Sequence, residues 1–140
     1  MGQINFDDLQ YRKRSYKAMA AYCASKLMNI HFTNALATRL APLGMTTNCL
    51  HPGAIRSGFA VKEGDFFGAL VRFGSVFLTS PEKGARTSIY LASDPSVADI
   101  NGAYFSGCKT KKPSRSARNT DISERLWSIS ESLIRFDSAE

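Results

Sequence analysis

The sequence predicts an α/β fold that forms one end of a larger layered sheet. Predicted elements alternate along the chain in the order helix, strand, helix, strand, which is typical of α/β proteins. Only about two strands can be identified, and two strands do not make an independent sheet. The chain has 140 residues, of which 44% are hydrophobic and 21% charged. This is the composition of one globular domain, and it excludes a chain that is disordered throughout.

The first predicted helix covers residues 18–40 and is followed by the stop signal Pro42 and Gly44. Its residues are rich in Ala, Leu and Met and include no Gly or Pro. Apolar side chains occur on more than one side at helical spacing. We therefore expect this helix to be either buried in the protein or shared with a partner subunit.

The remaining elements follow from shorter signals. Residues 45–50 predict a strand, which the turn at residues 51–53 ends. Ser80 and Pro81 predict the start of a helix that runs to about residue 93. A turn at Asn101 and Gly102 leads into a second strand at residues 103–106. A last helix, capped near Asp121, carries apolar residues at helical spacing: Ile122, Leu126, Trp127, Ile129 and Leu133.

Charge and cysteine content narrow the classes of partner and compartment. The net charge is +6, and part of the excess forms a basic loop: Lys109, Lys111, Lys112, Arg115 and Arg118. No aromatic residue interleaves this loop, so we expect no nucleic-acid partner, and salt-sensitive DNA binding is the weaker alternative. Three cysteines without metal or redox spacing and no secretory signal predict a cytoplasmic protein with reduced thiols and no metal site. No apolar run reaches the length of a membrane span.

Tyr22 and Lys26 are the strongest candidates for catalysis. They are four residues apart, which places both side chains on one helix face. A lysine ammonium beside a phenol favours the ionised phenolate, and a tyrosine tuned in this way can exchange a proton with a substrate oxygen. Taken alone, the pair also fits an ordinary amphipathic helix surface. Only the neighbouring sequence can distinguish a catalytic pair from such a surface.

The surrounding motifs resemble those of the short-chain dehydrogenase/reductase family, in its retinol-dehydrogenase-like branch. Residues 21–29, Ala-Tyr-Cys-Ala-Ser-Lys-Leu-Met-Asn, are similar to the active-site helix of that family. Residues 47–57 resemble its next strand and its Pro-Gly-x-Val-x-Thr loop, with Ile55 for Val and Ser57 for Thr. Residues 4–9, 80–85, 102–108 and 126–127 match further segments in order, so the resemblance covers nearly the whole chain.

The resemblance implies the C-terminal portion of a Rossmann-like, doubly wound parallel sheet and an NAD(P)-dependent oxidoreductase. Its substrate would be a small-molecule carbonyl or alcohol. Tyr22 would act as general acid/base, assisted by Lys26, and both would contact the cofactor. Pro52, Gly53, Ile55 and Ser57 would line the nicotinamide side. The resemblance favours NADP over NAD.

The family's Gly-rich turn, its Asn-Ala-Gly motif and its catalytic serine have no counterpart in this sequence. We therefore expect residues 1–140 to form a partial short-chain dehydrogenase domain without the N-terminal dinucleotide-binding half, and to be inactive alone. The alternative is a non-enzymatic fragment that acts as an interaction module, for example a homo-oligomer that pairs through its long helix.

The most apolar segment, residues 66–78, lies where the family places its variable substrate-covering helices. An apolar cover suits a lipophilic substrate or peripheral contact with a membrane, which would make the protein membrane-associated. Simple core packing explains the segment equally well.

Overall fold

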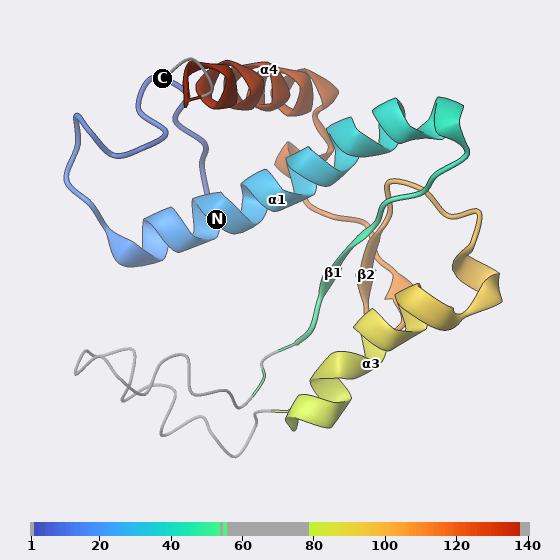
Figure 1. Cartoon of the computed structure of the whole chain (residues 1–140). Coiled ribbons are helices and arrows are strands. Elements are labelled where there is room, and N and C mark those ends of the chain that lie inside the picture. Colours follow the sequence, from blue (N-terminus) through green and yellow to red (C-terminus); the bar gives the residue numbers. More distant parts are fainter. Residues whose placement is uncertain (1, 54, 56–78, 138–140) are drawn as a thin grey trace. The chain divides into compact units, whose positions relative to one another are not determined.

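The computed structural model describes residues 2–53, 55 and 79–137, with side chains as far as residue 134. The elements that lie in these ranges are α1 (Ala18–Leu40), β1 (Cys49–His51), α3 (Pro81–Ser93), β2 (Tyr104–Ser106), β3 (Lys109–Thr110) and α4 (Thr120–Asp137), with three short 3-10 turns, η1 (Ala41–Leu43), η4 (Pro95–Val97) and η5 (Ser116–Arg118) (Figure 1). Helices alternate with strands, so the predicted α/β class is confirmed. The predicted cover segment, residues 66–78, lies outside the described residues.

The chain divides into two compact units, and each is described by itself. The first comprises residues 1–49, 99–104 and 112–140, and the second comprises residues 50–98 and 105–111.

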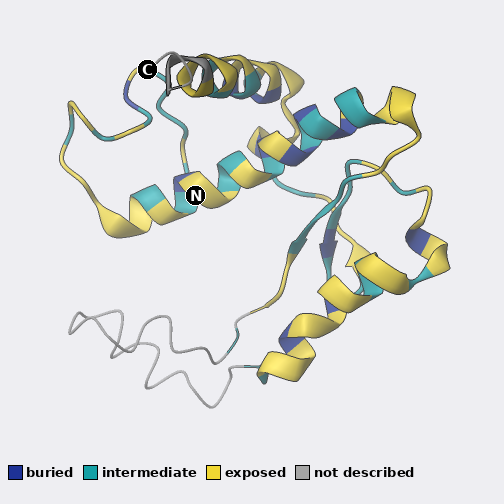
Figure 2. Ribbon diagram, viewed as in Figure 1, coloured by how far each residue is buried: buried dark blue, intermediate teal, exposed yellow. Residues whose placement is uncertain are grey.

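The core of the first unit lies between α1 and α4, which Figure 1 shows side by side. The buried positions of α1 concentrate in its C-terminal half, which contains His31, Thr33, Ala35 and Ala37 (Figure 2). Leu126 of α4 is buried as well. At the edge of this contact the ring of Phe32 stacks on Trp127 with 5.5 Å between centroids. The first half of α1 is mostly exposed, although Ala24 is buried.

The ends of both helices follow from local chemistry. Gly44 adopts the left-handed conformation, with φ +67°, after the 3-10 turn that ends α1, so the predicted stop is confirmed. The last helix begins slightly earlier than predicted, because Asn119 caps it in place of Asp121. The Asn119 Oδ1 accepts hydrogen bonds from the Asp121 and Ile122 amides at 2.9 and 3.3 Å.

A loop precedes α1, and Asp8 organises it from within. Its carboxylate accepts hydrogen bonds from the backbone amides of Arg12, Lys13 and Arg14 at 2.7, 3.2 and 3.1 Å. The Asp8 residue is only 9% exposed. The guanidinium of Arg14 lies 3.9 Å from the centroid of the Tyr11 ring. These contacts fix the residues that lead into the helix carrying Tyr22.

The three strands form one sheet in the order β1-β2-β3. The Gly102 amide donates to the Thr47 carbonyl and the Cys49 amide to the Ala103 carbonyl, at 2.8 and 3.0 Å. These bonds advance in the same direction along both segments, as they do between parallel strands. Between β2 and β3 the pairing is antiparallel, with Phe105 opposite Thr110.

The sequence predicted two strands, and the third is a correction. A two-residue turn joins β2 to β3, and its residues Gly107 and Cys108 have φ values of +60° and +57°. A type I′ hairpin turn needs positive φ at both central residues, which glycine supplies readily and cysteine rarely does. The predicted first strand was also too long at its start, since β1 begins only at Cys49.

In the second unit α3 is capped as predicted. The Ser80 hydroxyl accepts the Lys83 amide at 3.4 Å, and Pro81 occupies the first helical position. Only Gly84 and Thr87 of this helix are buried, and Figure 2 shows the rest of it largely exposed. The Thr87 hydroxyl accepts the amide of Cys108 at 3.2 Å, which ties the helix to the strained hairpin turn.

Candidate active site

The predicted catalytic pair lies on the exposed first half of α1. The Lys26 ammonium is 5.4 Å from the centroid of the Tyr22 ring, so the two side chains are neighbours, as their spacing requires. Tyr22 is 46% exposed, and Lys26 is exposed too. The Ser25 hydroxyl donates to the Tyr22 carbonyl at 2.8 Å. This hydroxyl is therefore bonded to the backbone of the helix and not to the side chain of Tyr22 or Lys26. The tyrosine ring and the neighbouring ammonium are therefore both partly exposed to solvent.

The second group of predicted residues follows β1, at Pro52, Gly53 and Ile55. Gly53 has φ +87°, and its amide donates to His51 Nδ1 at 2.8 Å. Among the residues that the structure describes, no atom lies within 4 Å of the position that a side chain at Gly53 would take. A glycine is needed here for its positive φ. Ser57 lies outside the described residues.

The two groups belong to different units. Tyr22 and Lys26 are in the first, whereas Pro52, Gly53 and Ile55 are in the second. Within the first unit, the helix repeat places Tyr22 beside Lys26. Within the second unit, the hydrogen bond to His51 holds Gly53, and a bridge from Ile55 to Thr79 connects the loop to the start of α3.

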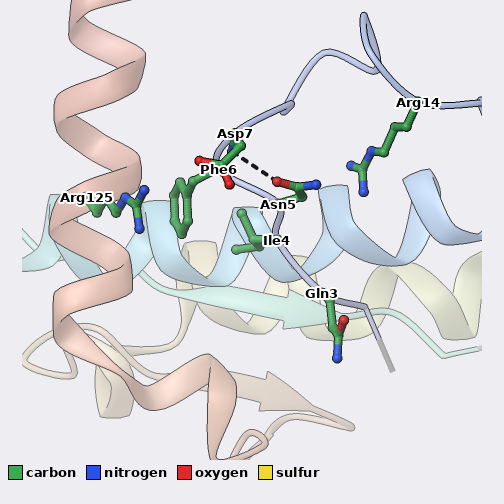
Figure 3. Close-up of a pocket in the computed structure, with 7 residues that line it drawn as sticks. All are labelled: Gln3, Ile4, Asn5, Phe6, Asp7, Arg14 and Arg125. Atoms are coloured by element: carbon green, nitrogen blue, oxygen red, sulfur yellow. Dashed lines mark hydrogen bonds between the residues drawn. The ribbon is translucent and has the colours of Figure 1, made fainter.

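A pocket of about 400 Å³ lies in the first unit and contains none of the predicted site residues. Its lining consists of Gln3, Ile4, Asn5, Phe6, Asp7, Arg14 and Arg125. Figure 3 shows Arg125 of α4 against the face of Phe6, with Arg14 on the other side of the N-terminal segment. The Arg125 guanidinium lies 4.3 Å from the Phe6 centroid. Sequence reasoning missed this pocket because residues from three separate segments form it.

The three cysteines are free, and burial raises the pKa of the Cys49 thiol. In the described parts of the chain, no three His, Cys, Asp or Glu side chains gather in a way that could hold a metal ion. No helix within those same residues is long and apolar enough to span a bilayer.

Comparison with known proteins decides the family. A match to the short chain dehydrogenase family covers residues 10–66, which include both groups of predicted site residues. Human retinol dehydrogenase 13 is 38% identical over 98% of the chain, and human retinol dehydrogenase 12 is 42% identical over 96%. The chain belongs to the short-chain dehydrogenase family. Its resemblance to the retinol-dehydrogenase-like branch, expected from the motifs, is confirmed.

Two further comparisons show how much of a short-chain dehydrogenase this chain represents. It is 36% identical to the human WW domain-containing oxidoreductase over 96% of its length. A crystal structure of an uncharacterized protein from Mycobacterium paratuberculosis superposes with a TM-score of 0.69 and 27% identity, over 96% of this chain and 46% of that one. The chain spans 43%, 42% and 33% of the three curated relatives, which is less than half of each. As predicted, its elements form part of a Rossmann-like α/β fold.

Proposed function

We propose that the protein containing this chain is an NAD(P)-dependent oxidoreductase that interconverts a lipophilic alcohol and its carbonyl, with Tyr22 as the general acid/base. The proposal rests on the proximity of Tyr22 and Lys26 on an exposed helix face. The Lys26 ammonium lies 5.4 Å from the centroid of the Tyr22 ring. In the reducing direction the Tyr22 hydroxyl gives its proton to the carbonyl oxygen, and in the oxidising direction it takes that proton back.

Lys26 has two roles in this proposal. Its positive charge stabilises the phenolate left on Tyr22, and its N–H groups are suited to donate to sugar hydroxyls of a dinucleotide. The second role requires an ammonium that a bound dinucleotide can reach, and the exposed Lys26 side chain meets that requirement.

The loop after β1 fits the nicotinamide end of the cofactor. No described residue crowds the space beside Gly53, and its backbone is exposed next to Pro52, which would let a flat ring approach closely. We assign Pro52, Gly53, Ile55 and Ser57 to this side of the cofactor. The dinucleotide, NADP in preference to NAD, would supply the hydride, while these residues orient its ring.

The substrate class follows from relatives named retinol dehydrogenases, to which the chain is 38–42% identical. A long apolar primary alcohol such as retinol is therefore the first substrate to test. Peripheral contact with a membrane would suit such a substrate and belongs to the same proposal.

The test uses the chain itself and a hybrid in which residues 1–140 replace the aligned portion of human retinol dehydrogenase 12. The hybrid supplies the length that the chain does not span. We expect the hybrid to oxidise retinol with NADP and to lose at least a hundredfold in turnover when Tyr22 becomes Phe. Tyr16→Phe is the matched control, because Tyr16 is an exposed tyrosine elsewhere in the same unit. Full turnover in the Tyr22→Phe hybrid would refute the role of this residue.

A second proposal is that the chain acts as an interaction module through α1. Its support is the exposure of large apolar side chains on that helix, with Phe32 52% exposed and Met19 48% exposed. Analytical ultracentrifugation of the chain should then show a dimer that Phe32→Ser weakens. A monomer at all concentrations would exclude pairing between two copies.

A further inference from the structure

Gly84 lies buried in the first turn of α3, and Ile55 occupies the space that a side chain there would fill. A methyl group on Gly84 would overlap the Ile55 Cδ1, and it would lie 2.7 Å from Cγ1 and 3.6 Å from Cγ2. Swinging the Cδ1 end away is not sufficient, since Cγ1 is also too close. Isoleucine is branched at Cβ and has few χ1 rotamers, so the whole residue would have to shift.

The backbone of Ile55 is held at the same place. Ile55 forms a parallel bridge with Thr79, the residue directly before the Ser80 cap of α3. Side chain and backbone thus anchor Ile55 to the start of one helix. Pro52 and Gly53 lie only two to three residues earlier, so the anchor limits where their exposed backbone can lie.

We infer that Gly84 is a positioning residue: because it has no side chain, Ile55 can pack on α3, and this packing holds Pro52 and Gly53 in place. The assignment of that loop to a nicotinamide ring rests on the proposed function. The packing itself does not, and it can be measured without a cofactor.

The first test uses the 140-residue chain and the variant Gly84→Ala. Alanine favours a helix more than glycine does, so without the Ile55 contact the substitution would raise the melting temperature. Because the new methyl group would collide with Ile55, we expect the melting temperature to fall instead. Hydrogen exchange at the Ile55 and Gly53 amides should become about tenfold faster. Ser88→Ala, at an exposed position of α3, is the control and should change neither amide. Unchanged exchange in Gly84→Ala would overturn the inference.

The second variant keeps the test decisive if Gly84→Ala weakens the fold generally. Ile55→Ala removes both crowded atoms, so Gly84→Ala should have little effect in that background. Ile55→Val removes only Cδ1, so combining it with Gly84→Ala should restore part of the protection of these amides against hydrogen exchange. If Gly84→Ala is equally damaging with Ile55→Ala in place, Ile55 does not mediate its effect.

The third test links the packing to the site, in the hybrid with NADPH. We expect Gly84→Ala to raise the KM for NADPH by about tenfold and to lower kcat as well, because the loop that would orient the nicotinamide ring is displaced. An unchanged KM for NADPH would overturn the positioning role. If the unaltered hybrid does not bind NADPH, the proposed function fails, whereas the exchange data still decide whether Gly84 positions the loop.

Discussion

The imidazole Nδ1 of His31 lies 2.8 Å from the Ser123 hydroxyl oxygen, inside the contact between α1 and α4. His31 is fully buried, and its Nε2 has no hydrogen-bond partner among the described residues. A charged imidazolium is costly in such a place, and burial lowers the pKa of His31 below its ordinary value. The helix pair is therefore built around a neutral histidine.

This predicts how stability depends on pH. An unfolded chain binds the His31 proton with a pKa of about 6.5, and the folded chain binds it only at lower pH. The contribution to the free energy of unfolding is thus complete above about pH 6.5 and is lost as the pH falls through the folded pKa. Urea denaturation between pH 8 and pH 5 should show this decline. His31→Gln should flatten it, and stability that rises on acidification would contradict it.

A second prediction concerns Arg39 and Glu124, whose side chains form two hydrogen bonds of 2.9 and 2.7 Å. The Arg39 guanidinium also lies 4.3 Å from the ring centroid of Trp127, the only tryptophan in the sequence. The hydrogen bond from Arg39 lowers the pKa of the Glu124 carboxyl. The pair is therefore intact above the ordinary glutamate range and separates as the pH falls through the lowered pKa.

Tryptophan fluorescence should report that separation. Releasing Arg39 changes the surroundings of the Trp127 ring, so its emission should shift with a midpoint below the ordinary glutamate pKa of about 4.3. Glu124→Gln should remove the transition. A transition of the same size in Glu124→Gln would show that another group causes it.

The Asp8 carboxylate supports a third prediction. Asp8→Ala leaves three backbone amides without their acceptor, and we expect a loss of about 2 kcal/mol in the free energy of unfolding. Hydrogen exchange at the Arg12 and Arg14 amides should accelerate at the same time. Asp7→Ala removes an exposed carboxylate next to it and serves as the control. Equal stability of the two variants would rule out Asp8 as the organiser of this loop.

A fourth prediction concerns Lys26 in the hybrid enzyme. Lys26→Met keeps the length of the side chain but removes the charge and the donors, so both kcat and cofactor affinity should fall. A loss of about 10²-fold in kcat/KM is expected if Lys26 both stabilises the phenolate and holds the ribose. Lys83→Met, on an exposed lysine of α3, should leave both constants near those of the parent hybrid. A Lys26→Met hybrid as active as the parent would exclude both roles.

The long helix was predictable from the sequence because its signals are local. Residues 18–40 contain no helix breaker, and Gly44 follows at the stop. The pairing of Tyr22 with Lys26 needs only the helix repeat, so it too could be foreseen. In this part of the chain, propensity and tertiary packing favour the same structure.

The first strand was predicted less well, because side chains take bonds that a strand would otherwise use. Asn48 donates to the Ile100 carbonyl and accepts from the Ala103 amide, and Asn101 accepts from the Thr47 amide. Regular pairing therefore begins only at Cys49. Such exchanges depend on residues about 50 positions apart, which no local pattern reveals. The contact of Gly84 with Ile55 was missed for the same reason.

The hydrogen bonds around Asn101 have a consequence for the chemical ageing of the protein. Asparagine followed by glycine is the sequence most prone to deamidation, in which the next backbone nitrogen attacks the side-chain amide. At Asn101 the attacking nitrogen is that of Gly102, whose N–H is bonded to the Thr47 carbonyl at 2.8 Å. The Asn101 amide is itself held by the Ala37 carbonyl at 3.0 Å. The folded chain thus protects its one Asn-Gly sequence from deamidation, and isoaspartate at this position would record how long a sample has spent unfolded.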